Sequence, residues 1–408
     1  MRNTINIDEW TPRDVVSMEE WCTSCGVQKE EALQLTFSDP NDARDIQVMT
    51  NQDLPAGQTV MFVPSSMVLR GNYVRQELGA ATASEELLAR RLGQTSETIS
   101  QFYLFLKILR EYEFGDQSPW FPWLNSLPRY FSNGASMTHF CCTQCLPPLV
   151  GSLANQERIR FIQFFRALQD VQFLTTETRS NRPLAKWAFA IVSTRSFPSQ
   201  DGTDYNIVPM ADMFNHGTNT EIQISYDEEG NCYAVTNYDV PAGSPLRMSY
   251  GDPTNPSKLF ARYGFLDETA PATFCKIMIT NPSQEIKDMG YDQSRMLFYK
   301  DTGEVSPEVW DVLLYQVLES NPSDQQVLYQ AHMNGDFETK QALHGQYFLQ
   351  TKVALQNHVD SFLNSLQTLS KKAEGRNLEI HPRLPLIMRH NEFVRNTFLL
   401  VKANLDQM

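Results

Sequence analysis

The sequence predicts an α+β protein in which a β-rich part interrupted by helices is followed by a helical part. Segments such as 32–37 and 222–226 carry apolar side chains at every second position, which is typical of strands with one buried face. Apolar side chains three and four positions apart, as in 99–110 and 341–369, indicate amphipathic helices. From about residue 282 onward the chain is rich in helix-forming residues, so the sequence divides into a β-rich part and a helical part.

The β-rich part contains the following elements in chain order. A short helix is expected at 17–26. Strands are expected at 32–37, 46–49 and 59–64, and the turn residues at 53–57 join the last two. Helices are expected at 85–92, 99–110, 155–172 and 182–192, the last with Pro183 in its first turn.

Strands return after residue 208. A hairpin is predicted where 222–226 and 232–235 flank a turn, and 246–250 alternates toward the corner Tyr250-Gly251. In the helical part, a stripe of apolar side chains along 341–369 indicates core packing.

Composition and charge exclude some classes of protein. Hydrophobic residues make up 41% of the 408 residues, an ordinary globular value, and no apolar run of about 18 residues predicts a membrane span. The net charge is −14 and no basic cluster stands out, which disfavours nucleic acid as a partner. We expect a monomer that is cytoplasmic or nuclear; the first sixteen residues make a poor transit peptide, although a plastid location stays open.

The seven cysteines predict reduced thiols rather than a disulfide framework, because their number is odd and they are scattered. Two groups of closely spaced cysteines could be considered as metal ligands, namely Cys22 with Cys25, and Cys141 with Cys142 and Cys145. A structural zinc ion needs four nitrogen or sulfur ligands in closed geometry. We interpret both groups as coincidental and expect no metal.

Two short motifs carry the functional information. The sequence PMADMFNH at 209–216 ends an apolar run at Asn215-His216, and MSYG at 248–251 ends another at Tyr250-Gly251. Together they resemble the catalytic core of SET-domain methyltransferases, most of all the branch that contains Rubisco large-subunit methyltransferase. The resemblance covers roughly residues 17–400 and is sharpest at 187–265.

The resemblance implies a fold and a domain organisation. A β-rich SET fold would occupy 17–270, with a helical insertion at about 85–190 and an N-terminal extension at 1–16. An all-α substrate-binding domain would occupy 271–408.

The resemblance also implies a reaction. It is methyl transfer from S-adenosylmethionine to a lysine of a non-histone protein, with histidine as an alternative acceptor. Such a displacement requires an aligned acceptor nitrogen and the exclusion of water, and few acid–base groups.

Site residues are implied by the same likeness. Tyr250 would be the catalytic tyrosine, while Asn215 and His216 would bind the cofactor and Arg195 would lie near both cofactor and substrate. Each has a plain structural alternative: a buried tyrosine at a strand end, a turn or cap, and an arginine at a helix end.

Four further residues match positions that line the family's substrate channel. Aromatic walls suit an alkyl stem with a polar tip. For Phe197 a core position is the more natural interpretation, and the carboxylate at position 212 could cap a turn. The four residues are Phe197, Asp212, Tyr226 and Tyr263.

The chain departs from the family in its first hairpin. The family's Gly-x-Gly falls on Asp45, Ile46 and Gln47, and no glycine occurs between 41 and 52. Glycine permits close backbone approach to a ligand, so side chains here could obstruct the cofactor. Two other hypotheses therefore stand beside the enzyme, namely a catalytically inactive SET-like interaction module and a scaffold formed by the helical part.

Overall fold

The structure is a computed structural model that describes residues 5–39, 42–93, 95–252, 254, 256–274, 283–292 and 295–408. The chain forms two compact units, which are described separately. The first comprises Met1–Ser136, Gln156–Gly251 and Arg262–Gly264; the second comprises Met137–Asn155, Asp252–Ala261 and Phe265–Met408. The domain boundaries 17–270 and 271–408 stay predictions, since they come from the resemblance and not from compactness.

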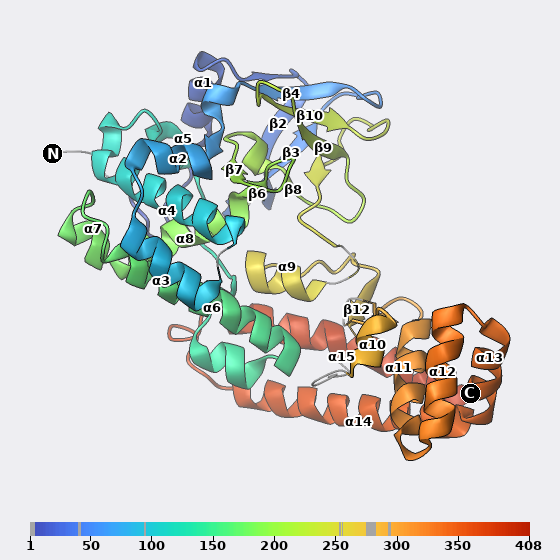
Figure 1. Cartoon of the computed structure of the whole chain (residues 1–408). Coiled ribbons are helices and arrows are strands. Elements are labelled where there is room, and N and C mark those ends of the chain that lie inside the picture. The colour runs from blue at the N-terminus through green and yellow to red at the C-terminus, as the bar shows by residue number, and fades with distance from the viewer. Residues whose placement is uncertain are drawn as a thin grey trace. The chain divides into compact units, whose positions relative to one another are not determined.

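The largest sheet of the first unit joins segments that are far apart in the sequence (Figure 1). Its strand order is β1-β4-β10-β9, with antiparallel neighbours. The strands are β1 (Gln28–Lys29), β4 (Thr59–Val63), β10 (Cys232–Thr236) and β9 (Ile222–Tyr226). An antiparallel pair, β2 (Leu33–Asp39) and β3 (Asp42–Thr50), forms a second sheet. The strands predicted in these regions are confirmed.

Two smaller sheets position the motifs. Strands β5 (Leu69–Arg70), β7 (Tyr205–Ile207) and β6 (Phe197–Pro198) form one sheet in the order β5-β7-β6. Strands β8 (Asn215–His216) and β11 (Arg247–Met248) pair in parallel, with Asn215 opposite Arg247. The strand predicted at 246–250 is therefore shorter than expected. Its pairing brings the two sequence motifs together.

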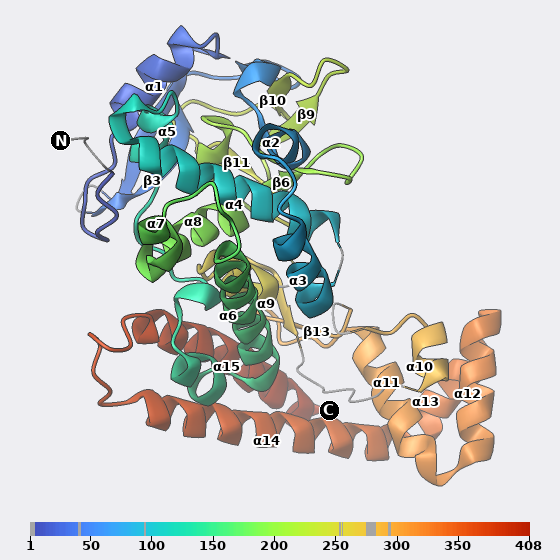
Figure 2. The ribbon, with the colours of Figure 1, turned by 60° about the vertical axis from the view of Figure 1, so that its left-hand side comes forward.

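The helices of the first unit surround a very apolar central helix, α4. Helices α2, α3 and α8 all contact it (Figure 2), so its residues from Phe102 to Leu106 are fully buried. Thr95 caps its N-terminus by accepting a hydrogen bond from the Thr98 amide. Helices that lie wholly or partly in this unit are α1 (Val15–Ser24), α2 (Gly71–Leu78), α3 (Thr82–Leu92), α4 (Ser96–Phe114), α5 (Phe121–Ser126), α6 (Pro148–Leu168), α7 (Thr176–Ser180), α8 (Arg182–Arg195) and α9 (Pro256–Tyr263).

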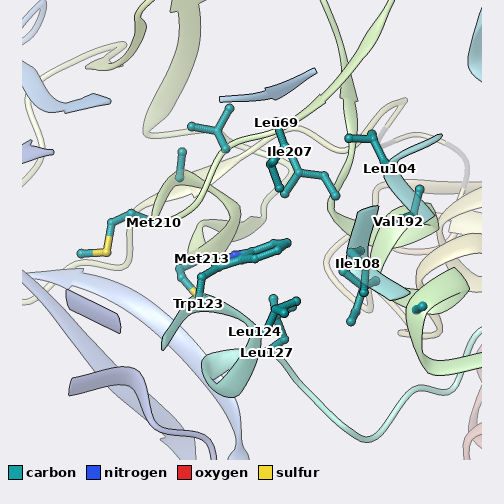
Figure 3. Close-up of a cluster of buried hydrophobic side chains, with 14 of the residues drawn as sticks. Leu69, Leu104, Ile108, Trp123, Leu124, Leu127, Val192, Ile207, Met210 and Met213 are labelled. Carbon is teal, nitrogen blue, oxygen red and sulfur yellow. The ribbon is translucent and has the colours of Figure 1, made fainter. Parts of the chain in front are cut away.

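The core of this unit extends to the motif at 209–216. Figure 3 shows the Trp123 ring in an apolar cluster that includes Leu104, Val192 and Met213. Although Trp123 is only 1% exposed, its indole N–H donates to Asp212 Oδ2 at 3.2 Å. The aromatic segment around residue 120 thus packs as expected and also supports the motif.

The second unit is mainly helical, but the all-α prediction for its C-terminal part is wrong in one detail. Strands β12 (Ala272–Phe274) and β13 (Leu297–Tyr299) pair antiparallel there. Its remaining elements are α10 (Gln284–Asp288), α11 (Pro307–Val317), α12 (Pro322–Asn334), α13 (Phe337–Gln346), α14 (Phe348–Ala373) and α15 (Leu384–Gln407). Among the described residues, no helix is both long and apolar enough to span a membrane.

The apolar stripe predicted along 341–369 is buried, but on two helices rather than one. The helical run is divided at Tyr347, between α13 and α14. Helices α14 and α15 lie side by side in Figures 1 and 2. Phe362 stacks on Phe398 between them, with ring centroids 4.3 Å apart, so this pair anchors the long helices.

Gly264 offers a test of the packing beside the motifs. Its φ is +80°, and a Cβ there would lie 2.3 Å from the Asn133 amide nitrogen. Gly57 has a similar φ of +76° but open space around it. We expect Gly57→Ala to cost about 1–2 kcal/mol of unfolding free energy from backbone strain alone. Gly264→Ala should cost at least about 2 kcal/mol more, because it also displaces backbone atoms.

Urea denaturation of both glycine variants and the unaltered protein measures the difference. Equal losses in the two variants would contradict the packing argument.

Candidate functional site

The motifs meet at a cavity of about 430 Å³ in the first unit. Its wall combines the end of α8, the 3₁₀ turn Ala211–Met213, the corner after β11 and the end of α9. The lining residues are Thr194, Arg195, Ser196, Phe197, Pro198, Tyr205, Asp212, Phe214, Met248, Ser249, Tyr250, Gly251, Arg262 and Tyr263. The parallel pairing of β8 with β11 brings these segments to one place.

Tyr250 is fixed on several sides. Its hydroxyl donates to the Phe214 carbonyl at 2.7 Å, and its amide donates to His216 Nδ1 at 3.0 Å. Its ring lies 4.7 Å from that of Tyr263, centroid to centroid. Burial raises the pKa of Tyr250 far above its ordinary value, although the nearby Arg195 charge lowers it. The phenol therefore keeps its proton throughout the physiological pH range.

Arg195 and Asp212 form a buried ion pair in the cavity wall. Arg195 Nη1 lies 3.3 Å from Asp212 Oδ2 and also donates to the Asp212 carbonyl. The Asp212 side chain is completely buried. Within the described ranges, Arg195 Nε and Asp212 Oδ1 are buried without a hydrogen-bond partner. The wall thus retains an unused donor and an unused acceptor.

A second arginine reaches the same region from the N-terminal extension. Arg13 Nε donates to the Ser126 carbonyl at 2.7 Å, and Nη2 lies 3.3 Å from Met213 Sδ. Burial, and then the Arg195 charge, lower the pKa of Arg13, while the Asp212 charge raises it. The carboxylate of Asp212 therefore pairs with Arg195, and its charge also stabilises the charged form of Arg13.

The two residues implied to bind cofactor lie beside the cavity rather than in its wall. Asn215 Nδ2 donates to the Ile46 carbonyl at 3.1 Å, which joins β8 to β3. Ile46 is the central position where the family has Gly-x-Gly. Here the segment belongs to β3, with Ile46 opposite Phe37 and Gln47 opposite Thr36, and the register of the pairing shifts between Phe37 and Asp39. Among the described residues the only non-glycine with positive φ is Met210. The described residues of β3 therefore have no backbone conformation that would require glycine.

The substrate-channel residues divide into two groups. Phe197, Asp212 and Tyr263 line the cavity together with Arg195 and Tyr250. The structure places Tyr226 elsewhere, in the wall of a second cavity of about 670 Å³. The roles of all these residues stay predictions, because no ligand contact tests them.

Sequence reasoning missed three residues near the site. Trp123 lay in a segment interpreted only as a packed loop, and Arg13 lay in the extension. Met210, buried and with φ +74°, is strained next to the ion pair. Only Trp123 had a signal, since a buried indole requires a hydrogen-bond acceptor and an aspartate stood in the motif.

The residues fit an S-adenosylmethionine-like group better than a metal. The unused buried donor of Arg195 suits a carboxylate, and the Asn215 amide offers both a donor and an acceptor. The described parts of the chain contain no cluster of three or more His, Cys, Asp or Glu side chains suited to a metal ion.

Comparison with solved structures identifies the fold. The chain resembles Rubisco LSMT bound to AdoMet, at 15% identity over 97% of this chain and 92% of that chain, with a TM-score of 0.61. It resembles Rubisco LSMT bound to sinefungin and monomethyllysine at 15% identity, with the same coverage and a TM-score of 0.63. The SET domain of LSMT bound to lysine and AdoHcy matches at 13% identity, over 97% and 91%, with a TM-score of 0.61.

These likenesses confirm the predicted α+β SET fold. At identities this low they establish the architecture alone. No protein-family model matches the sequence, and no curated protein matches it.

The buried carboxylate gives a stability prediction. Asp212→Asn removes the buried carboxylate that pairs with Arg195 and whose charge acts on Arg13, so we expect a loss of about 3–5 kcal/mol of unfolding free energy. The exposed Asp170→Asn is the matched control and should change stability by less than about 0.5 kcal/mol. Adding Arg13→Met to Asp212→Asn should restore part of the loss.

Urea denaturation measures all four proteins. A loss below about 1 kcal/mol in Asp212→Asn would show that the carboxylate is not what balances the two arginines.

Proposed function

We propose that this protein is an S-adenosylmethionine-dependent protein-lysine methyltransferase that acts on a non-histone protein. The observation that carries the proposal is the partly buried, protonated Tyr250 hydroxyl, which donates to the Phe214 carbonyl in the cavity wall beside Asn215 and His216. The SET fold is consistent with it, and the similar solved structures bind AdoMet, AdoHcy, lysine or methyllysine.

The cavity suits a lysine side chain. The rings of Phe197, Tyr250 and Tyr263 lie in its wall, and such rings accommodate an alkyl stem. A neutral amine is the nucleophile in this reaction. Desolvation favours the neutral form of an amine, so a largely apolar wall helps to supply it.

Tyr250 would orient the acceptor amine. Its single proton is committed to the Phe214 carbonyl, so toward the amine the phenol oxygen would act as the acceptor of an N–H. An amine held in this way directs its lone pair along one line, which is what an in-line displacement needs.

The cofactor would be held by Asn215, the backbone of His216 and the spare donor of Arg195. When bound, it supplies an electrophilic methyl group on a sulfonium. The mainly helical second unit is proposed to bind the substrate protein.

An inactive SET-like module is the second candidate, and one observation favours it. Asp45 and Gln47 place side chains where the family has glycines, in the strand whose Ile46 carbonyl accepts from Asn215. Cofactor binding separates the two candidates.

Calorimetric titration with S-adenosylmethionine and S-adenosylhomocysteine tests the cofactor site. We expect one saturable site. Asn215→Ala should weaken binding about tenfold or more, because a buried polar contact is lost. The exposed Asn357→Ala on α14 is the control and should bind like the unaltered protein. Absence of binding in the folded, unaltered protein would favour the inactive module.

Tyr250→Phe tests the catalytic role. Removing the hydroxyl should lower the turnover of labelled methyl transfer to a lysine peptide array by about 100-fold. Cofactor affinity should stay within about twofold, because the hydroxyl contacts a carbonyl of the protein. Tyr238→Phe, which alters a partly exposed ring, should retain full turnover. Full turnover in Tyr250→Phe would remove the residue from the mechanism.

A further inference from the structure

A second cavity, of about 670 Å³, lies in the first unit next to the one that holds Tyr250. Its wall combines helix α2, the loop between β6 and β7, and the turn after β9. Three carboxylates stand in this wall, those of Asp201, Asp204 and Asp227, and Arg70 is the one cation among the residues that line it. The lining therefore has an excess of negative charge.

Neutral groups hold all three carboxylates in place. Asp204 accepts from the Asn72 amide at 3.1 Å with each of its oxygens. Asp201 accepts from the Ser199 hydroxyl at 2.6 Å, and Asp227 accepts from the Asn231 amide at 2.8 Å.

No lysine or arginine lies within ion-pair distance of these three carboxylates in the part of the chain that the structure describes. Hydrogen bonds from neutral donors fix a carboxylate but leave its charge in place. Those with Ser199 and Asn231 lower the pKa values of Asp201 and Asp227, so both stay ionised at neutral pH.

The cavity also contains buried polar atoms that lack partners. Asn206 is only 4% exposed, and its Oδ1 accepts no hydrogen bond from any described residue. The same holds for the Tyr226 hydroxyl. Burial raises the pKa of that phenol and a hydrogen-bond contribution from the nearby Asn206 side chain lowers it by less, although the two side chains do not meet the geometry of a full hydrogen bond. Buried polar atoms without partners are uncommon, so this wall is suited to a ligand that donates hydrogen bonds.

We propose that this second cavity binds a basic side chain of the substrate protein, arginine above all, close in sequence to the lysine that is methylated. A guanidinium offers five N–H donors in a planar fork together with a positive charge. It can therefore serve carboxylate, amide and phenol oxygens at once. An ammonium has three donors around a point charge and matches this set less well. The inference rests on the proposed lysine acceptor in the first cavity.

The two cavities share the ribbon formed by β6 and β7. Pro198 and Tyr205 pair across the ribbon and line the first cavity, whereas Ser199 and Asn206 line the second. Pro198 and Ser199 are neighbours in the chain, as are Tyr205 and Asn206, so the two cavities adjoin at this ribbon. One short extended segment, at roughly 3.3–3.6 Å per residue, can enter two adjoining cavities. We therefore place the basic residue within a few positions of the acceptor lysine.

Equilibrium binding of labelled peptides tests the proposal without requiring catalysis. Each eleven-residue probe has a central lysine in an Ala/Ser/Gly background, with one arginine at a position from −4 to +4. A matched probe carries citrulline, which is the neutral isostere, in place of arginine. We expect one or two registers in which arginine binds about tenfold or more tighter than citrulline.

Variants assign that preference to the second cavity. Asp201→Asn and Asp227→Asn should each reduce the arginine-over-citrulline ratio severalfold. Glu228→Gln removes the same charge from the same turn, but outside the wall, and should retain the ratio. Arg70→Gln removes the like charge and should raise it. Thermal denaturation confirms that each variant is folded.

Equal binding of arginine and citrulline probes in every register would overturn the proposal, as would ratios that the two aspartate variants leave unchanged. Equal binding of a lysine probe would overturn the preference for arginine.

Methyl transfer to the same probes is a separate measurement. Arginine-dependent binding without methyl transfer would contradict the proposed enzyme activity and support the second site. Methyl transfer without an arginine preference would support the enzyme activity and contradict the second site.

Discussion

The buried carboxylate of Asp212 is the interaction on which the candidate site depends. It accepts from the Trp123 indole, pairs with Arg195 and acts on the charge of Arg13. Four separate segments of the chain therefore converge on one group. A fully buried carboxylate is costly unless charge and hydrogen bonds offset the loss of water, so each segment must reach its place for the others to be stable.

The backbone beside this carboxylate is strained. Met210 takes a positive φ two residues before Asp212, and its side chain is buried, so the surrounding packing holds this turn in place. From that turn the chain enters β8, where His216 receives the Tyr250 amide and β11 pairs in parallel. The position of the Tyr250 hydroxyl is thus a consequence of how Asp212 is buried.

Local patterns predicted the local elements well. The alternation at 222–226 gave strand β9 with its bounds, and Pro183 marks the first turn of α8. Patterns could not predict pairing between β4 and β10, whose residues are some 170 positions apart, because periodicity carries no information about partners. The break at Tyr347 and the arrival of Arg13 depend likewise on tertiary contacts. That the motif residues meet could be predicted, because two short sequences matched a known pattern. The same pattern misplaced Tyr226, which lines a different cavity.

The missing glycines bear on affinity more than on the geometry of transfer. Glycine in such a hairpin allows the backbone to approach a ligand closely. Here Ile46 lies in strand β3, opposite Phe37, and its carbonyl already accepts a hydrogen bond from the Asn215 side-chain amide. A ligand beside β3 must therefore meet side chains of that strand and share Asn215 with it. The contacts of Tyr250 with the Phe214 carbonyl and with the Tyr263 ring do not involve β3. For the proposed enzyme, this combination of residues predicts weaker cofactor binding beside an acceptor site that keeps these contacts.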